Sequence, residues 1–146
     1  MNKTAKELFT KEDKANIRQA MLNAELDTSA NLTVYIELNC EDSAQKKAQK
    51  IFNKKQSVKC DKKHEILFYL AIDSLQYAVI GGEEVINKFP DSYWNEITES
   101  FEGQLKKKLY KESLIKGIEI TGRFLKKLFP CQTGNVDDLN EEIIIK

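Results

Sequence analysis

The sequence has no net charge and only three cysteines, and each of these two features excludes a class of protein. It also has only one histidine and two prolines. Its 23 lysines and arginines balance 23 aspartates and glutamates. Indiscriminate binding to nucleic acid or to an anionic membrane surface needs an excess of basic residues, so we expect no nucleic-acid partner. Three cysteines far apart in a chain of 146 residues fit reduced thiols better than a disulfide framework. We therefore expect a cytoplasmic protein.

Long apolar runs are also missing. The longest, from Ile66 to Ile72, has seven residues, whereas a helix that crosses a bilayer needs about 20. The first residues lack the apolar stretch of a signal peptide, so we expect no membrane insertion. The hydrophobic share of 41% is enough for a proper core. It predicts a single domain over residues 1–146, with a core from about 9 to 130 and a C-terminal tail, 131–146, that packs on it.

The balanced total charge hides separate charge blocks. Residues 46–63 hold eight lysines and one acid, residues 69–104 hold seven acids and one lysine, and residues 106–127 hold eight basic residues and two acids. Such runs usually map to solvated helix faces. If the fold joins the two basic blocks, they form a recognition surface for an acidic partner, which we expect to be another protein. The residues that we single out for this binding surface are Lys62, Lys63 and His64.

Capping signals and apolar spacing predict helices in several places. Thr10 is a hydroxyl cap with an acid, Asp13, three residues later, and an apolar stripe of Ile17, Met21 and Ala24 follows it. The expected helix starts are Thr10, Ser43, Glu83, Pro90–Asp91 and Leu109. The last helix should run to about residue 128. It contains Gly117 and Gly122, which predict a close approach of neighbouring helices because glycine otherwise weakens a helix.

The remaining apolar segments predict a small sheet. Alternation over residues 32–38 is typical of a half-buried strand, and residues 66–72 are apolar on both sides, as in a central strand. A two-residue turn at Asp73–Ser74 would join residues 66–72 to a strand at 75–80 as a hairpin. The tail at Ile143–Ile145 would add an edge strand or cover a groove. Together these elements predict an α/β fold, a three-layer αβα sandwich with a small mixed β-sheet flanked by helices.

His64 is the first residue that could carry chemistry. It follows Cys60 by four residues, a spacing that on a helix could begin a metal site or a Cys–His nucleophile pair. The residues between them indicate a loop instead. A histidine exposed in a surface loop is therefore the expected alternative.

Gly81–Gly82 is the second candidate, because it lies between a strand and a helix like a phosphate-binding loop. It lacks the sequence signature of such a loop. Glu83 and Glu84 also place two negative charges at the helix N-terminus, where they would repel a phosphate. These two acids either complement the helix dipole or hold a hard cation such as Ca²⁺.

The order of several short motifs resembles the TPM domain family, which occurs in thylakoid-lumen proteins of photosystem II repair, in a nematode acetylcholine-receptor modulator and in many bacterial proteins. The likeness covers nearly the whole chain and fits the short, stand-alone bacterial form. Its pieces are Phe9-Thr10-Lys11-Glu12-Asp13, Ala24-Glu25, Thr28-Ser29, Phe52, Ile66 to Ala71, Tyr77-Ala78-Val79-Ile80-Gly81, Pro90 with Trp94, Phe101 with Gly103, Gly117 with Gly122, and Phe129-Pro130.

This resemblance implies an αβα sandwich, divalent-cation binding in some members and a disputed acid phosphatase activity, both attributed to acidic residues at the edge of the sheet. The chain departs from the family pattern at that edge. The family's Thr-Ser-Gly-Glu-Ile, Gly-Asp and Arg-Asn-Gly stand here as Thr28-Ser29-Ala30-Asn31-Leu32, Gly81-Gly82 and Lys63-His64-Glu65. The departures remove carboxylates, so a cation would need Glu25, Glu83 or Glu84 as substitute ligands.

We therefore expect a non-catalytic binding and interaction module with the TPM fold that has lost the family's divalent-metal site. This hypothesis predicts no catalytic residues and no cofactor. Two alternatives remain, a Ca²⁺-binding regulatory domain and a weak metal-dependent acid phosphatase. Both need Ca²⁺ or Mg²⁺ held by Glu25, Glu83 or Glu84.

Overall fold

The structure, a computed structural model, describes residues 5–26, 28–54, 64–130 and 142–146. The helices are α1 Ala5–Leu8, α2 Lys11–Glu25, α3 Ala44–Lys54, α4 Glu83–Lys88, α5 Asp91–Lys106 and α6 Tyr110–Leu128. The strands are β1 Asn31–Glu37, β2 Glu65–Ala71, β3 Gln76–Gly81 and β4 Glu142–Ile145. Within these residues, no helix combines the length and the apolar character that crossing a membrane requires.

The described strands form one mixed sheet in the order β3-β2-β1-β4. β1 is parallel to β2 and to β4, whereas β2 and β3 are antiparallel. The helix α3 connects the parallel strands β1 and β2 as a crossover. The predicted mixed sheet, hairpin and helical crossover are confirmed, and the C-terminal isoleucines form the edge strand β4.

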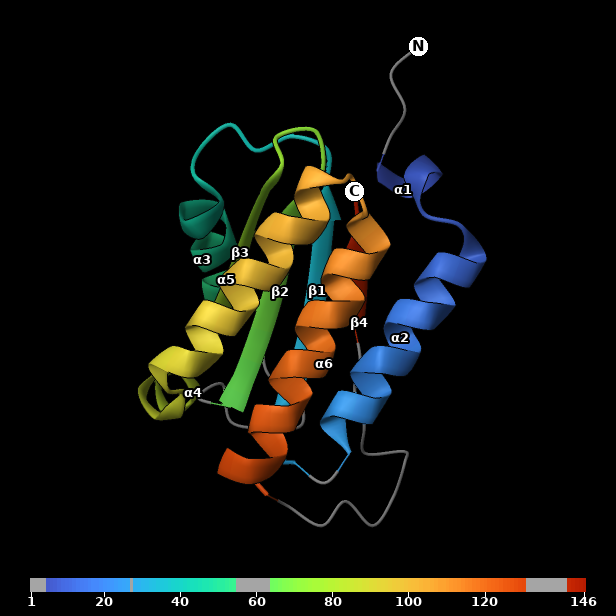
Figure 1. Ribbon diagram of the computed structural model, residues 1–146. Helices are drawn as coiled ribbons and strands as arrows, with labels where there is room; N and C mark the ends of the chain where they lie inside the picture. The colour runs from blue at the N-terminus through green and yellow to red at the C-terminus, as the bar shows by residue number, and fades with distance from the viewer. Residues whose placement is uncertain (1–4, 27, 55–63, 131–141) are drawn as a thin grey trace.

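Helices cover the sheet on both faces. Alternate residues of β2, such as Phe68, pack toward α2, α5 and α6, while Tyr69 and its neighbours of the same parity pack toward α3. In Figure 1 the three long helices lie in front of the sheet and α3 lies behind it. Every residue of β2 is buried, as predicted for a central strand, and the αβα sandwich is confirmed.

The hairpin turn differs from its prediction. Ala71 pairs with Gln76 across the hairpin, so the loop has four residues, 72–75, and the expected two-residue turn at Asp73–Ser74 is wrong. The reason lies in the neighbouring strand: the backbone N–H groups of Ile72 and Asp73 donate to the carbonyls of residues 37 and 38. The chain therefore turns back only later, through Leu75, whose φ is 50°.

The predicted helix starts are confirmed, and two of them, at Thr10 and Ser43, are capped by side-chain hydrogen bonds. Thr10 Oγ1 accepts the N–H of Asp13 at 3.0 Å, and the Asp13 carboxylate accepts the N–H of Thr10 at 3.0 Å, which completes a capping box. Ser43 Oγ accepts the N–H of Lys46 at 3.1 Å at the start of α3. The expected stripe of α2, Ile17, Met21 and Ala24, is buried.

Replacing Asp13 by Asn should remove a pH-dependent part of the stability. The pKa of Asp13 lies below its ordinary value, chiefly because the carboxylate accepts the Thr10 N–H, and the Lys111 ammonium 3.4 Å away adds to this. A lowered folded-state pKa gives stability that is present above the unfolded pKa of about 3.9 and is lost as the pH falls through the folded pKa. Urea unfolding should therefore show Asp13→Asn less stable by about 0.5 kcal/mol at pH 7. The difference should vanish near pH 2, and a constant difference at both pH values would contradict this account.

The two glycines of α6 mark close helix contacts, as predicted. A Cβ on Gly122 would lie 2.9 Å from the Cβ and 3.0 Å from the Cα of Ala24 in α2. A Cβ on Gly117 would lie 2.7 Å from Cε2 of Phe101 in α5. Gly103 on α5 is the opposite case, because nothing lies within 4 Å of a Cβ placed there.

The basic blocks do not combine over the described residues. The lysines of α3 and those of α6 belong to helices that cover opposite faces of the sheet. The described lysines of the two blocks therefore lie on opposite sides of the sheet, and a joint basic surface that includes residues 55–63 stays a prediction. Lys62 and Lys63 lie outside the described residues, as does Cys60.

Candidate functional site

The positions that depart from the family pattern meet at one end of the strands of the sheet. We call this end, where β1 and β2 begin, the edge. β1 and β2 begin at this edge, with Asn31 opposite Glu65 in the parallel register. β3 ends there, and the N–H of Gly82 donates to the carbonyl of Glu65 at 2.9 Å. His64 directly precedes β2, and α4 starts after Gly82. Segments far apart in the sequence therefore form one candidate site.

Three side chains make a hydrogen-bonded chain at this edge, and we call Ser29, His64 and Glu84 the edge cluster. Ser29 Oγ lies 3.1 Å from His64 Nδ1, and His64 Nε2 contacts the Glu84 carboxylate. A carboxylate only accepts, so it favours the imidazole form with a proton on Nε2, and Nδ1 of a neutral ring then accepts from the serine hydroxyl. The cluster ties together the segments before β1, before β2 and in α4.

Phe129, directly after α6, packs against the edge cluster. Its ring lies 5.0 Å from the His64 ring, centroid to centroid, and its carbonyl accepts the N–H of Ser29 at 3.1 Å and the hydroxyl of Thr28 at 2.7 Å. The His64 side chain is 24% exposed. The expected surface-loop histidine is thus partly buried, because the ring packs on Phe129 and bonds through both nitrogens.

The structure does not gather the three predicted cation ligands into one group. Glu25 is buried at the end of α2 and accepts the N–H of Leu32 at 2.8 Å. Glu83 is exposed in the first turn of α4, and the Glu84 carboxylate contacts His64. Across the described ranges, no group of three His, Cys, Asp or Glu side chains could hold one metal ion.

The donor set at this edge does not fit Ca²⁺ or Mg²⁺. Both ions need several oxygen ligands, most of them carboxylates or carbonyls. Gly82 supplies no side chain, Asn31 supplies an amide instead of a carboxylate, and the carboxylate of Glu84 already contacts an imidazole. Two further carboxylates of this edge, Glu25 and Glu65, are buried, and Glu25 accepts the N–H of Leu32. The imidazole is a poor ligand for either ion.

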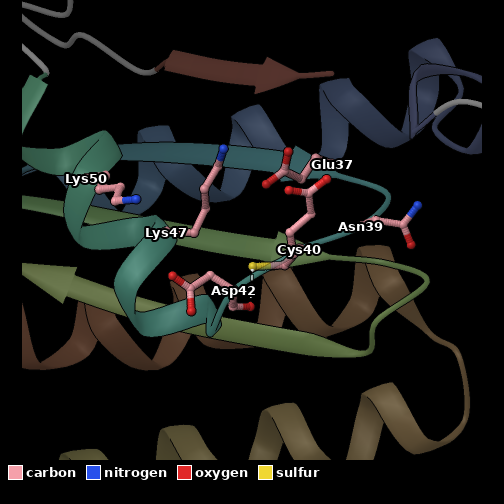
Figure 2. A pocket seen from close by; sticks show the side chains of 7 residues that line it. Glu37, Asn39, Cys40, Asp42, Lys47 and Lys50 are labelled. Atoms are coloured by element: carbon pink, nitrogen blue, oxygen red, sulfur yellow. Dashed lines mark hydrogen bonds between the residues drawn. The ribbon is translucent and has the colours of Figure 1, made fainter.

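A second candidate lies at the opposite end of the parallel strands, where β1 ends and α3 begins (Figure 2). It is a cavity of about 630 Å³. Its lining consists of Glu37, Asn39, Cys40, Glu41, Asp42, Lys47 and Lys50. Ligands of open α/β sheets usually bind outside the carboxyl ends of the strands. Sequence reasoning missed this pocket, although the polar run 39–42 after an apolar strand was the available signal.

This pocket is polar and carries both signs of charge. Lys47 extends from α3 toward β1, the strand that ends at Glu37 (Figure 2). The hydroxyl of buried Tyr69 donates to the Glu37 carboxylate; burial, and then this contact, raise the pKa of Tyr69 and keep it neutral. The Cys40 thiol donates to the carbonyl of Asp42 at 2.9 Å. The described lining of this pocket contains two lysines, Lys47 and Lys50, and no histidine.

Comparison with known proteins adds a family and a fold. A family model described as the TPM domain matches residues 3–123. The solution structure of the BA42 protein from the psychrophilic bacterium Bizionia argentinensis is 23% identical, with a TM-score of 0.77 over 91% of this chain and 94% of that chain. The N-terminal domain of the cg2496 protein from Corynebacterium glutamicum is 15% identical, with a TM-score of 0.65 over 82% of this chain and 75% of that chain. At these identities the two structures show a shared fold. No curated protein sequence matches the chain.

Proposed function

The chain belongs to the TPM domain family, and from this premise we propose that it is a binding module that works without a divalent cation and without catalysis. The observation that carries the proposal is the edge cluster. Its histidine bonds to Ser29 on one side and to Glu84 on the other. An imidazole N–H thus satisfies a carboxylate at the edge where the resemblance places the acids of the family's site.

The same geometry argues against the two alternatives. Metal-assisted phosphate hydrolysis needs a cation that polarises the phosphate and lowers the pKa of a bound water. A Ca²⁺-binding regulatory domain needs the same ligands without the turnover. Glu84 is the carboxylate of the edge cluster, and His64 already contacts it. The neighbouring carboxylates of Glu25 and Glu65 are buried. Binding to another protein needs none of these groups, and we propose a protein as the partner.

Titration of Ca²⁺ and Mg²⁺ into chelator-treated protein tests the loss of the metal site. We expect no localised change in the amide chemical shifts of residues 82–84 at millimolar metal, and no hydrolysis of an aryl phosphate with either ion. Localised shifts at these residues would contradict the proposal. So would turnover that Glu84→Gln abolishes.

Restoring the missing carboxylates should restore cation binding. The double variant Asn31→Glu with Gly82→Asp rebuilds the family's two acids. Gly82 has φ −64° and ψ 167° at the N-cap of α4, a conformation that suits Asp, which is also a favoured N-cap residue. We expect 5 mM Ca²⁺ to raise the melting temperature of this variant and not that of the parent, since a ligand of the native state stabilises it. The matched control is Asn31→Gln with Gly82→Asn, which has similar shape and no charge and should not respond.

A further inference from the structure

A groove lies between the β2–β3 hairpin and α5, and it shares no lining residue with the second candidate pocket. Its volume is about 440 Å³, within the range of pockets that bind small ligands or peptide side chains. The residues that line it are Leu75, Tyr77, Glu99, Glu102, Gly103, Leu105 and Lys106. We call it the hairpin groove.

Leu75, which lines the groove, has an unfavourable backbone conformation and an unfavourably exposed side chain. Its φ of 50° lies in the left-handed region, which leucine rarely occupies. Its side chain is also 46% exposed, so the fold gains little burial in return. A backbone outlier of this kind is a reason to look for a functional contact at its position, so Leu75 is a candidate contact residue of the groove.

The floor of the groove is apolar and already formed. The ring of Tyr77 stacks on Phe101 with centroids 4.5 Å apart and planes 6° apart, and Leu105 is buried. Gly103 leaves the floor open, because a Cβ there would meet nothing within 4 Å. Because this apolar floor is already ordered, binding a side chain there costs less conformational entropy.

The wall of the groove on α5 is acidic. Glu99 and Glu102 lie one turn apart along its length, and Lys106 lies one turn beyond Glu102. Burial raises the pKa of Tyr77, a hydrogen bond with Thr98 lowers it, and the negative charge of Glu102 raises it to a smaller extent. A partner that combines an apolar side chain with positive charge would complement both surfaces.

We propose that the hairpin groove binds a peptide segment of a partner protein in which a bulky apolar residue is flanked by lysine or arginine. The apolar side chain enters over Tyr77 and Gly103 and covers Leu75, and the basic side chains pair with Glu99 and Glu102. The proposal rests on the proposed function, that the chain is a binding module. It names a surface other than the edge cluster, so the cation titrations can fail without affecting it.

Selection from a phage-displayed library of random 12-residue peptides tests this proposal, with the 146-residue chain as the target. Gly103→Phe fills the groove from a position with free space, and Gly103→Ala is the matched control that leaves it open. We expect selected peptides to share a Leu, Ile, Phe or Met beside Lys or Arg. The synthesised peptide should shift the amide signals of Leu75, Tyr77 and Gly103. Its affinity should fall at least tenfold with Gly103→Phe and stay within twofold with Gly103→Ala.

The double variant Glu99→Lys with Glu102→Lys should lower the affinity for the same peptide at least tenfold. Circular dichroism of each variant verifies that it is folded. Selected peptides that are acidic, that shift amides elsewhere or that bind Gly103→Phe as well as the parent would overturn the proposal, as would a failure to enrich any peptide. Self-association of the parent that Gly103→Phe abolishes would also overturn it, because the occupant would then be a second copy of the chain.

Discussion

Phe101→Ala is expected to lower the free energy of unfolding by about 4 kcal/mol. The Phe101 side chain is 1% exposed and lies between two other rings, with centroid distances of 4.5 Å to Tyr77 and 6.4 Å to Phe68. Its removal leaves a cavity at the point where α5, α6 and the sheet meet, and packed surroundings close such a cavity only in part. Urea unfolding with an unchanged m-value would measure the loss.

A second substitution can show that α6 defines this cavity. Gly117→Leu alone should destabilise by about 3 kcal/mol, because its Cβ would lie 2.7 Å from Cε2 and 2.9 Å from Cζ of Phe101. In the Phe101→Ala background the new leucine enters the space that the ring has left. The free energy of unfolding of the double variant should therefore fall by at least about 2 kcal/mol less than the sum of the two single decreases. Additive losses would contradict the close packing of these two helices at residue 117.

Gly122→Ala is expected to lower the free energy of unfolding by about 2 kcal/mol, even though alanine favours a helix more than glycine does. The new methyl group would lie 3.0 Å from the Cα of Ala24, and a backbone atom can yield only if α2 moves as a whole. The matched control is Gly103→Ala in α5, where the space is open. That control should gain up to about 1 kcal/mol.

The pair of alanine variants separates packing from helix propensity. If propensity dominated, both substitutions would stabilise the protein. If α2 and α6 meet as the structure shows, the two changes have opposite signs in the same thermal or urea experiment. Equal effects would contradict the contact between Gly122 and Ala24.

The sequence was most informative where a single local rule decides the structure. The capping box at Thr10 and Asp13 depends on residues three apart, and the burial of β2 follows from an apolar run on both faces. The glycines of α6 signalled close contacts because nothing else explains glycine inside a helix, but only the structure shows that their neighbours are Ala24 and Phe101.

Features that depend on several segments were beyond the sequence. The four-residue hairpin loop follows from hydrogen bonds that Ile72 and Asp73 donate to the chain after β1. The place of His64 follows from Ser29, Glu84 and Phe129, which come from three other parts of the chain. Composition could show the lysine blocks but not that the sheet separates α3 from α6.

The partners of β1 also bear on the order in which the chain folds. Val34 pairs with Phe68 on one side and with Ile143 on the other, so no neighbour of β1 in the sheet is close to it in sequence. The β2–β3 hairpin and the α5–α6 pair are built from local contacts, which form early because little chain entropy is lost. We expect β4 to dock late. Contacts that form after the transition state slow unfolding without speeding folding, so this last strand sets how long the native state lasts and has little influence on how fast it is reached.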